Sequence, residues 1–343
     1  MEKIVFWNNK GGTGKTSLVF QTICDYAHSN KSEKILAVDM CPQCNLSEMM
    51  LGGLQGKGSD NLLMRQGQTP RATVGGYFQM RLSSPITPPE FTANNFITYP
   101  NRDNYNNSIP SNVDLVCGDP LLELQSNALS TLANTNVPGE NYWIGVIDWL
   151  KDFFDKVHDV YDVVFIDTNP SFSIYTQIAI STADKVILPV MADDSSRRAI
   201  QNAISLIYGL KLPSEIYTKY AFAEKLKEVN RRLPKIHLIV KNRITQYMGA
   251  ASAYATVLEK IGNDIIGLCT DNPHIFTFTD KEANNHIIEV RDFQTAGVVA
   301  HARACPFYCL SCGRLDILGR RVQVDKERKE KCAEDIAKIT AAL

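Results

Sequence analysis

The sequence predicts an α/β fold, a mostly parallel, doubly wound sheet with helices on both faces. Short, continuously apolar segments recur along the 343 residues, among them 4–8, 35–39 and 163–167, and such segments are typical of strands buried on both faces. Amphipathic stretches of helical period lie between them, so strands and helices alternate. Two of these strands end in an acid, Asp39 and Asp167. Because ligands bind at the carboxyl edge of such sheets, the two acids indicate a site there.

The elements follow in chain order. The first strand, 4–8, runs into a glycine-rich turn, and a helix is expected from about Lys15 to His28, with Leu18 and Ile23 on its apolar side. Further apolar strands are expected at 35–39, 113–117, 163–167, 185–190 and 236–240.

The segment 52–112 differs from the rest of the chain. It is rich in Gly, Pro, Ser and Asn, and seven of its residues between Asn94 and Asn112 are asparagine. We therefore expect a long excursion from the sheet with little regular structure. A terminal helix is expected at about 325–343. No linker composition is apparent, so residues 1–343 are predicted to form one domain.

Composition excludes several classes of protein. Hydrophobic residues make up 44% and charged residues 21%, which excludes wholly disordered and fibrous chains. No apolar run is long enough to span a membrane. The N-terminus lacks the apolar region of a secretion signal, so a cytoplasmic location and mostly reduced cysteines are expected. A net charge of −1 argues against a generally basic nucleic-acid binder but allows local basic patches.

The segment 10–16 has the pattern of a phosphate-binding loop. Glycines let the backbone bend tightly and approach phosphates closely, and the following helix N-terminus supplies donors. Lys15 is expected to reach the terminal phosphates, and the Thr16 hydroxyl is expected to bind Mg²⁺. The other residues expected to contact the nucleotide are Gly11, Gly12, Thr13, Gly14 and Ser17.

The extra lysine at Lys10 makes this loop resemble the deviant Walker A motif of the ParA and MinD ATPases. Three further segments resemble that family: 39–45 is similar to its Asp-x-Asp-Pro-Gln-x-Asn element, 161–171 to its Walker B strand, and 183–190 to the strand that follows. The Pro-Gln pair places the resemblance nearer to the ParA branch.

The resemblance implies a P-loop NTPase that binds ATP and Mg²⁺ and closes into a homodimer. Lys10 would cross the interface to the partner's phosphates, together with Lys15 and Asp39 as the catalytic set. Asp167, Asp39 and Thr16 would support Mg²⁺, and Asn242 would contact the base. A closed dimer brings lysines of both subunits close to each other. It is favoured only when a triphosphate supplies the negative charge that attracts them.

One position departs from the family pattern. Cys41 stands where the family usually has the acid that positions the attacking water. A thiol carries little negative charge unless its pKa is lowered. The resemblance, with this departure, implies a weak ATPase with tight binding and slow hydrolysis, unless Asp193 or Asp194 supplies the acid.

Three cysteines, Cys305, Cys309 and Cys312, have a spacing that zinc or an iron–sulfur cluster could use, with His301 and Cys332 as further ligands. The alternative is a set of reduced, partly buried thiols.

Relatives in the ParA branch bind non-specific DNA as ATP dimers, through phosphate contacts from Lys and Arg. The terminal segment lacks Trp and Phe, so no membrane anchor is expected. Candidate DNA contacts lie in two basic segments and a central pair: Arg197, Arg198, Arg231, Arg232, Arg320 and Arg321.

Two functions stay open. The first is an ATPase that positions or segregates DNA or cargo, associated with the nucleoid and stimulated or read by a partner protein. The second is a nucleotide-gated switch or scaffold in a defence or regulatory complex, with little hydrolysis. A reductase with a bridging iron–sulfur cluster is a third, weaker match.

Overall fold

The computed structural model describes residues 1–191, 193–244 and 251–343. Within them the central sheet has eight strands in the order β10-β9-β8-β1-β7-β2-β4-β3, and all neighbours are parallel except β3 and β4. The strands are β1 (Glu2–Phe6), β2 (Ile35–Met40), β3 (Ile97–Thr98), β4 (Val113–Val116), β7 (Val163–Thr168), β8 (Lys185–Met191), β9 (Lys235–Ile244) and β10 (Ile287–Arg291). The predicted fold class is confirmed. The edge strands β3 and β10 were not predicted.

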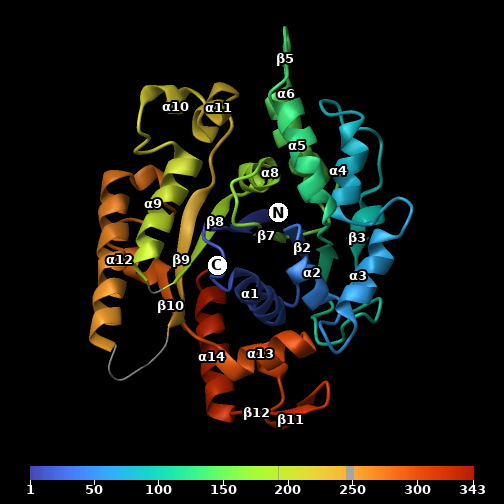
Figure 1. Cartoon of the computed structure of the whole chain (residues 1–343), viewed down its shortest axis with the longest axis vertical. Coiled ribbons are helices and arrows are strands. Elements are labelled where there is room, and N and C mark those ends of the chain that lie inside the picture. Colours follow the sequence, from blue (N-terminus) through green and yellow to red (C-terminus); the bar gives the residue numbers. More distant parts are fainter. Residues whose placement is uncertain (192, 245–250) are drawn as a thin grey trace.

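Helices cover both faces of this sheet (Figure 1). On one face lie α1 (Lys15–Ser29), α2 (Asn45–Met50), α3 (Gly58–Gln66), α13 (Gln294–Arg303) and α14 (Lys326–Thr340). On the other lie α4 (Val74–Leu82), α5 (Leu121–Ala133), α6 (Tyr142–Ile147), α7 (Trp149–Asp155), α8 (Ile174–Thr182), α9 (Asp194–Tyr208), α11 (Phe222–Glu228) and α12 (Ala251–Asp271). Alternate side chains of each strand enter the two resulting cores, as Val5 and Phe6 do, which explains the continuous apolar runs.

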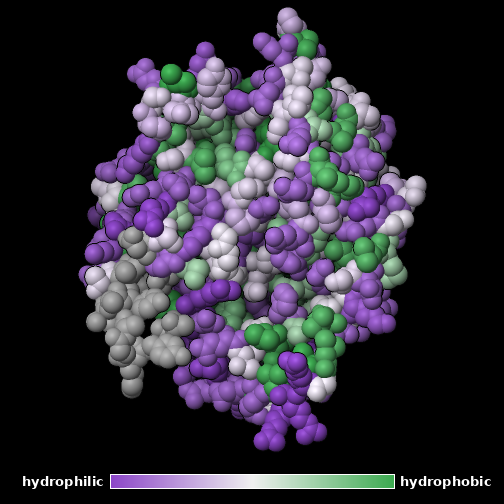
Figure 2. Space-filling model, in the orientation of Figure 1, coloured by the Kyte–Doolittle hydropathy of each residue, from purple (hydrophilic) through white to green (hydrophobic). Residues whose placement is uncertain are grey.

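Smaller elements complete the chain. They are α10 (Glu215–Lys219), the 3₁₀ turns η1 (Ala93–Phe96), η2 (Pro273–Ile275), η3 (Ala283–His286) and η4 (Phe307–Cys309), and the hairpins β5–β6 (Asn136–Val137, Glu140–Asn141) and β11–β12 (Gly313–Ile317, Arg320–Val324). A cleft of about 460 Å³ separates α5 and α8 from the α9–α11 region, and it is visible as the hollow at the top of Figure 2.

The segment 52–112 is more regular than the sequence suggested. It contains α3, α4, η1 and β3, and the expectation of little regular structure is wrong. Aromatic side chains explain the order: Tyr77, Phe78 and Phe96 are almost completely buried against α7. Apolar burial of this size offsets the entropy of ordering a polar segment.

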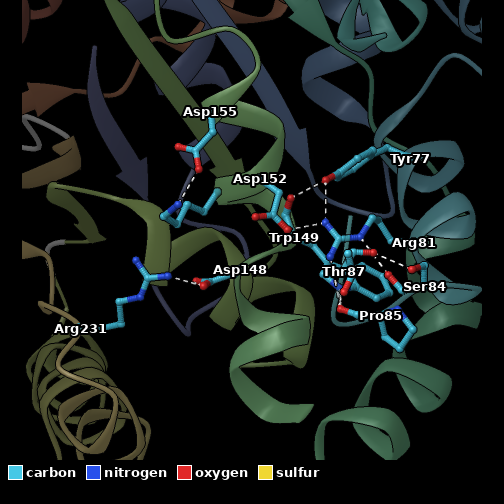
Figure 3. A network of polar contacts seen from close by, with 11 residues as sticks. Tyr77, Arg81, Ser84, Pro85, Thr87, Asp148, Trp149, Asp152, Asp155 and Arg231 are labelled. Atoms are coloured by element: carbon cyan, nitrogen blue, oxygen red, sulfur yellow. Dashed lines mark hydrogen bonds and ion pairs between the residues drawn. The ribbon is translucent and has the colours of Figure 1, made fainter. Parts of the chain in front are cut away.

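A buried arginine fixes this segment to α7 (Figure 3). Arg81 of α4 is fully buried and forms an ion pair with Asp152 at 2.5 Å. Its guanidinium also donates to the Tyr77 hydroxyl and to the Pro85 carbonyl at 3.3 Å each. The Trp149 indole donates to the same carbonyl at 2.8 Å. Since a buried charge is costly unless it is paired and hydrogen-bonded, these contacts are what allow an arginine here.

The chain ends on α14, which packs against α1 and β10. The last residues return to the sheet: His237 of β9 contacts the Ala342 carbonyl at 2.7 Å, and Lys185 donates to the Leu343 carbonyl at 3.0 Å. No helix in the described residues is both long and apolar enough to cross a membrane.

Candidate nucleotide site

The glycine-rich loop joins β1 to α1. Gly12 and Gly14 have φ of 74° and 75°, a region that favours glycine. Gly14 is also the N-cap of α1. Because glycine has no side chain, no side-chain hydrogen bond caps the first amides of the helix. A Cβ at Gly14 would lie 2.8 Å from the side-chain nitrogen Nδ2 of Asn242, and the positive φ would strain any other residue, so glycine is favoured here. The loop therefore presents a free helix N-terminus, which favours an anion.

Three predicted residues meet beneath the loop. Lys15, with 8% of its side chain exposed, forms an ion pair with the fully buried Asp167. The Thr16 hydroxyl donates to Asp167 Oδ2 at 2.8 Å. A lysine, a hydroxyl and a carboxylate are the groups that a magnesium–triphosphate complex needs at one point.

Asp39 lies beside Asp167, since the two are register partners on β2 and β7. Asp39 is fully buried and accepts hydrogen bonds from the Ser47 amide at 2.9 Å, the Ser47 hydroxyl at 2.7 Å and the Cys41 amide at 3.0 Å. Burial, and then the charge of Asp167, raise the pKa of Asp39 to about 7.

Cys41, rather than Asp39, lines the cavity next to the loop. Only 6% of this residue is exposed. Burial, followed by the charges of Asp39 and Asp167, raises the pKa of the Cys41 thiol to about 12. The thiol is therefore neutral at physiological pH, and the position that the family pattern gives to an acid carries no charge.

Lys10 is held within its own subunit. Its Nζ lies 2.5 Å from Asp193 Oδ2 and 2.5 Å from Ser195 Oγ, at the start of α9. Burial alone would raise the pKa of Asp193, but hydrogen bonds from Lys10 and from Ser195 and Ser196 lower it to about 2. Asp193 is thus a charged partner of Lys10. The side chain of Asp194 lies outside the described residues.

Asn242 and Arg243 lie near the carboxyl end of β9, the strand next to β8, and pack against the loop. The side-chain nitrogen Nδ2 of Asn242 donates to the Thr13 carbonyl at 2.8 Å. The side-chain oxygen Oδ1 accepts from the backbone amide of Arg243 at 2.9 Å. Both polar groups of Asn242 are therefore engaged with protein. Arg243 was not assigned to this site from the sequence, yet its guanidinium Nε lies 3.2 Å from where a Gly14 Cβ would stand.

These groups surround a cavity of about 320 Å³. The loop residues named from the sequence line it, apart from Gly11. Six residues that were not assigned to the site from the sequence also line it: Gln43, Asn45, Thr168, Pro170, Arg243 and His301. The Pro-Gln-Cys-Asn turn after β2 was the signal for Gln43 and Asn45.

Comparison with known proteins agrees with this geometry. The profile of a family described as an AAA domain (AAA_31) matches residues 1–215. The chain belongs to this family. Together with the fold, the match confirms the relation to ParA- and MinD-type P-loop ATPases. A search of curated proteins finds no significant match.

Solved structures share the fold over most of the chain. A Cyanothece McdA variant in complex with ATP is 14% identical with a TM-score of 0.58, over 100% of this chain and 96% of that chain. The pNOB8 ParA structure is 15% identical with a TM-score of 0.51, over 84% and 81%.

The six arginines proposed for DNA do not lie together. Arg197 and Arg198 are on α9, which follows the carboxyl end of β8, and Arg197 is paired with Asp264 at 2.6 Å. Arg231 and Arg232 lie at the opposite edge of the sheet, in a pocket with the N-terminus, and Arg231 is paired with Asp148. The remaining pair, Arg320 and Arg321, is in the β11–β12 hairpin.

The cysteine cluster is not arranged as a metal site. Across residues 1–191, 193–244 and 251–343, no group of three or more His, Cys, Asp or Glu side chains is placed to hold a metal ion. Cys305 and Cys309 approach each other, Cys312 is exposed, and Cys332 is buried in the α14 core. The zinc or iron–sulfur assignment for these residues is therefore not supported.

Proposed function

We propose that this chain binds ATP with Mg²⁺ at the β1–α1 loop, as one ATPase domain. The observation that carries the proposal is the contact of Lys15 and Thr16 with Asp167 beneath a free helix N-terminus. A bound triphosphate would accept from the loop amides and from Lys15, which frees the Asp167 carboxylate. Asp167 and the Thr16 hydroxyl would then hold the Mg²⁺, which neutralises phosphate charge.

The second part of the proposal is that ATP drives homodimerisation through Lys10. In the single chain Lys10 is neutralised by Asp193. Crossing to a partner's phosphates requires breaking this partly exposed pair, which costs little because such ion pairs are weak. A triphosphate offers more negative charge than a diphosphate, so the exchange favours ATP over ADP.

Hydrolysis is proposed to be slow, because the neutral Cys41 thiol lies where an acid would position water. This observation also favours the second candidate function, a switch or scaffold that reports nucleotide state by dimerising. In the first candidate, the dimer positions or segregates DNA or cargo in the cytoplasm, on the nucleoid, and a partner protein stimulates its turnover.

Size-exclusion chromatography with light scattering tests dimerisation, using no nucleotide, ADP and ATP. Wild-type protein is expected to be dimeric only with ATP. Lys10→Ala should still bind ATP but stay monomeric, Lys15→Ala should lose ATP binding, and Lys31→Ala at an exposed site should behave as wild type. A dimer that forms equally with Lys10→Ala would refute the crossing lysine, and a wild-type chain that binds no ATP would refute the nucleotide site.

A further inference from the structure

Two cysteines that the proposed mechanism does not use face each other after α13. Cys305 follows the end of α13, and Cys309 closes the 3₁₀ turn η4. Their Sγ atoms are 3.3 Å apart, and both lie near the Pro306 carbonyl oxygen, at 3.5 and 3.4 Å. A disulfide bond is about 2.05 Å long, so the two sulfurs already lie close to bonding distance.

The two thiols are chemically unequal. Cys309 is exposed, whereas Cys305 is partly covered. The hydrogen bond from Cys305 lowers the pKa of Cys309, and the charge of Lys329 adds to this. The same hydrogen bond, followed by burial, raises the pKa of Cys305. Cys309 is therefore the accessible sulfur with more thiolate character, which is the pattern of a reactive cysteine with a resolving partner.

A cavity of about 640 Å³ opens beside this pair. Tyr308 lies on one side, stacked on His28 with ring centroids 4.3 Å apart. Lys31 also lines it and is exposed. The cavity thus adjoins both sulfurs and carries a cation, which favours a small ligand that bears carboxylates.

We propose that Cys305 and Cys309 form a reversible redox site that reacts with an acidic, low-molecular-mass disulfide of the glutathione type. The Cys309 thiolate attacks one sulfur of the small disulfide, which forms a mixed disulfide and releases one small thiol. Cys305 then loses its proton and attacks the Cys309 sulfur, which forms the Cys305–Cys309 bond and releases the second small thiol. Two protein thiols are oxidised and one small disulfide is reduced to two thiols.

The surroundings indicate that this bond is reversible rather than structural. It would close a loop of only about five residues, and short loops gain little from cross-linking. Exposed disulfides of this kind are readily reduced. The turn is attached to α1 by the buried Gln21, which accepts from the Phe307 amide at 2.8 Å, so oxidation acts on a turn that is fixed to the core.

Peptide mapping after oxidation tests the proposal. Reduced full-length protein is treated with oxidised glutathione and quenched in acid. It is then alkylated and digested with trypsin, and the mass of the peptide 304–314 is measured by mass spectrometry. Wild type and Cys312→Ser should both lose two hydrogens and resist alkylation at Cys305 and Cys309, and dithiothreitol should restore both thiols. Cys309→Ser should form no such bond. A stable glutathione adduct on Cys309, or a bond that needs Cys312, would overturn the assignment.

The acidic recognition has its own test in the same assay. Lys31→Glu should slow the reaction with oxidised glutathione several-fold and leave the rate with the neutral hydroxyethyl disulfide unchanged. Equal rates with both reagents in this variant would show that Lys31 recognises no carboxylate. Neither assay contains nucleotide, so the results are independent of ATP binding.

Discussion

Two residues at the end of β2 differ in their position relative to the cavity beside the glycine-rich loop. Asp39 is fully buried behind it and accepts three hydrogen bonds. Cys41 lines it but stays neutral. The Asp39 carboxyl therefore does not line the cavity. Cys41 does line it, but its neutral thiol has no charge with which to orient water.

Restoring an acid at Cys41 should accelerate turnover. We expect Cys41→Asp to raise the rate of phosphate release at least about tenfold, because a placed carboxylate orients and deprotonates the attacking water. ATP affinity is measured on the same preparation to establish that the site is intact. Cys312→Asp, at an exposed cysteine, should leave the rate unchanged. A Cys41→Asp protein that binds ATP and turns over no faster would show that another step limits hydrolysis.

Asp39 should make stability depend on pH in the absence of nucleotide. The folded carboxyl holds its proton up to about pH 7, whereas an unfolded aspartate releases it near about pH 4. The folded state thus binds more protons between these values, so this contribution is full below about pH 4 and is lost as pH rises towards 7. Melting temperatures between these limits should fall less in Asp39→Asn than in wild type. Asp103→Asn, at an exposed aspartate, should match wild type, and equal slopes in all three would contradict the buried proton.

Individual residues show which parts of the site could be predicted from the sequence. Lys15, Thr16 and Asp167 were predicted because a loop motif and a strand end fix their positions locally. Arg243 and His301 were not assigned to the site because they lie on β9 and α13. No local sequence pattern shows that these two elements pack beside the loop. The contact between Lys10 and Asp193 likewise joins residues 183 positions apart.

Among the elements, α4 shows why the segment 52–112 was misjudged. The segment as a whole is rich in polar residues, but the aromatic residues of α4, together with Arg81, enter a core formed with α7. Composition averages over the segment, whereas burial depends on which few side chains meet a distant helix. The sequence around Arg81 gives no sign that this charged side chain will be fully buried.

The Arg81 network should be a major source of stability for α4. Arg81→Met is expected to lower the free energy of unfolding by about 3 kcal/mol, since it leaves the Asp152 carboxylate without its cation and removes a donor from the buried Tyr77 hydroxyl. Urea unfolding measures this. Lys151→Ala removes a surface i,i+4 pair on the same helix as Asp152 and should cost less than about 1 kcal/mol. Equal decreases in the two variants would mean that burial of Arg81 contributes little.

For the whole molecule, the three arginine pairs lie too far apart to contribute to one DNA-binding surface together, so their positions indicate which pair is best placed to bind DNA. The α9 pair and the 231–232 pair lie at opposite edges of the sheet, and each contains an arginine already paired with an aspartate. Arg320 and Arg321 are exposed, and neither forms an ion pair with any described residue. The start of α14, a few residues later, adds Arg328 and Lys329, and its Lys326 is paired with Glu330. The hairpin therefore offers the most available positive charge.

We accordingly expect DNA binding by the ATP dimer to depend on the β11–β12 hairpin. Fluorescence anisotropy with a short duplex at several salt concentrations measures both affinity and its salt dependence. Changing Arg320 and Arg321 together to alanine should weaken binding and lower the slope of log affinity against log salt by about one for each phosphate that the variant no longer neutralises. The matched double change at Arg231 and Arg232 should leave both quantities near wild type. Because phosphate contacts carry no sequence information, duplexes of different sequence should respond alike. An unchanged slope in the hairpin variant, with weaker binding in the 231–232 variant, would place the DNA surface at the other edge of the sheet.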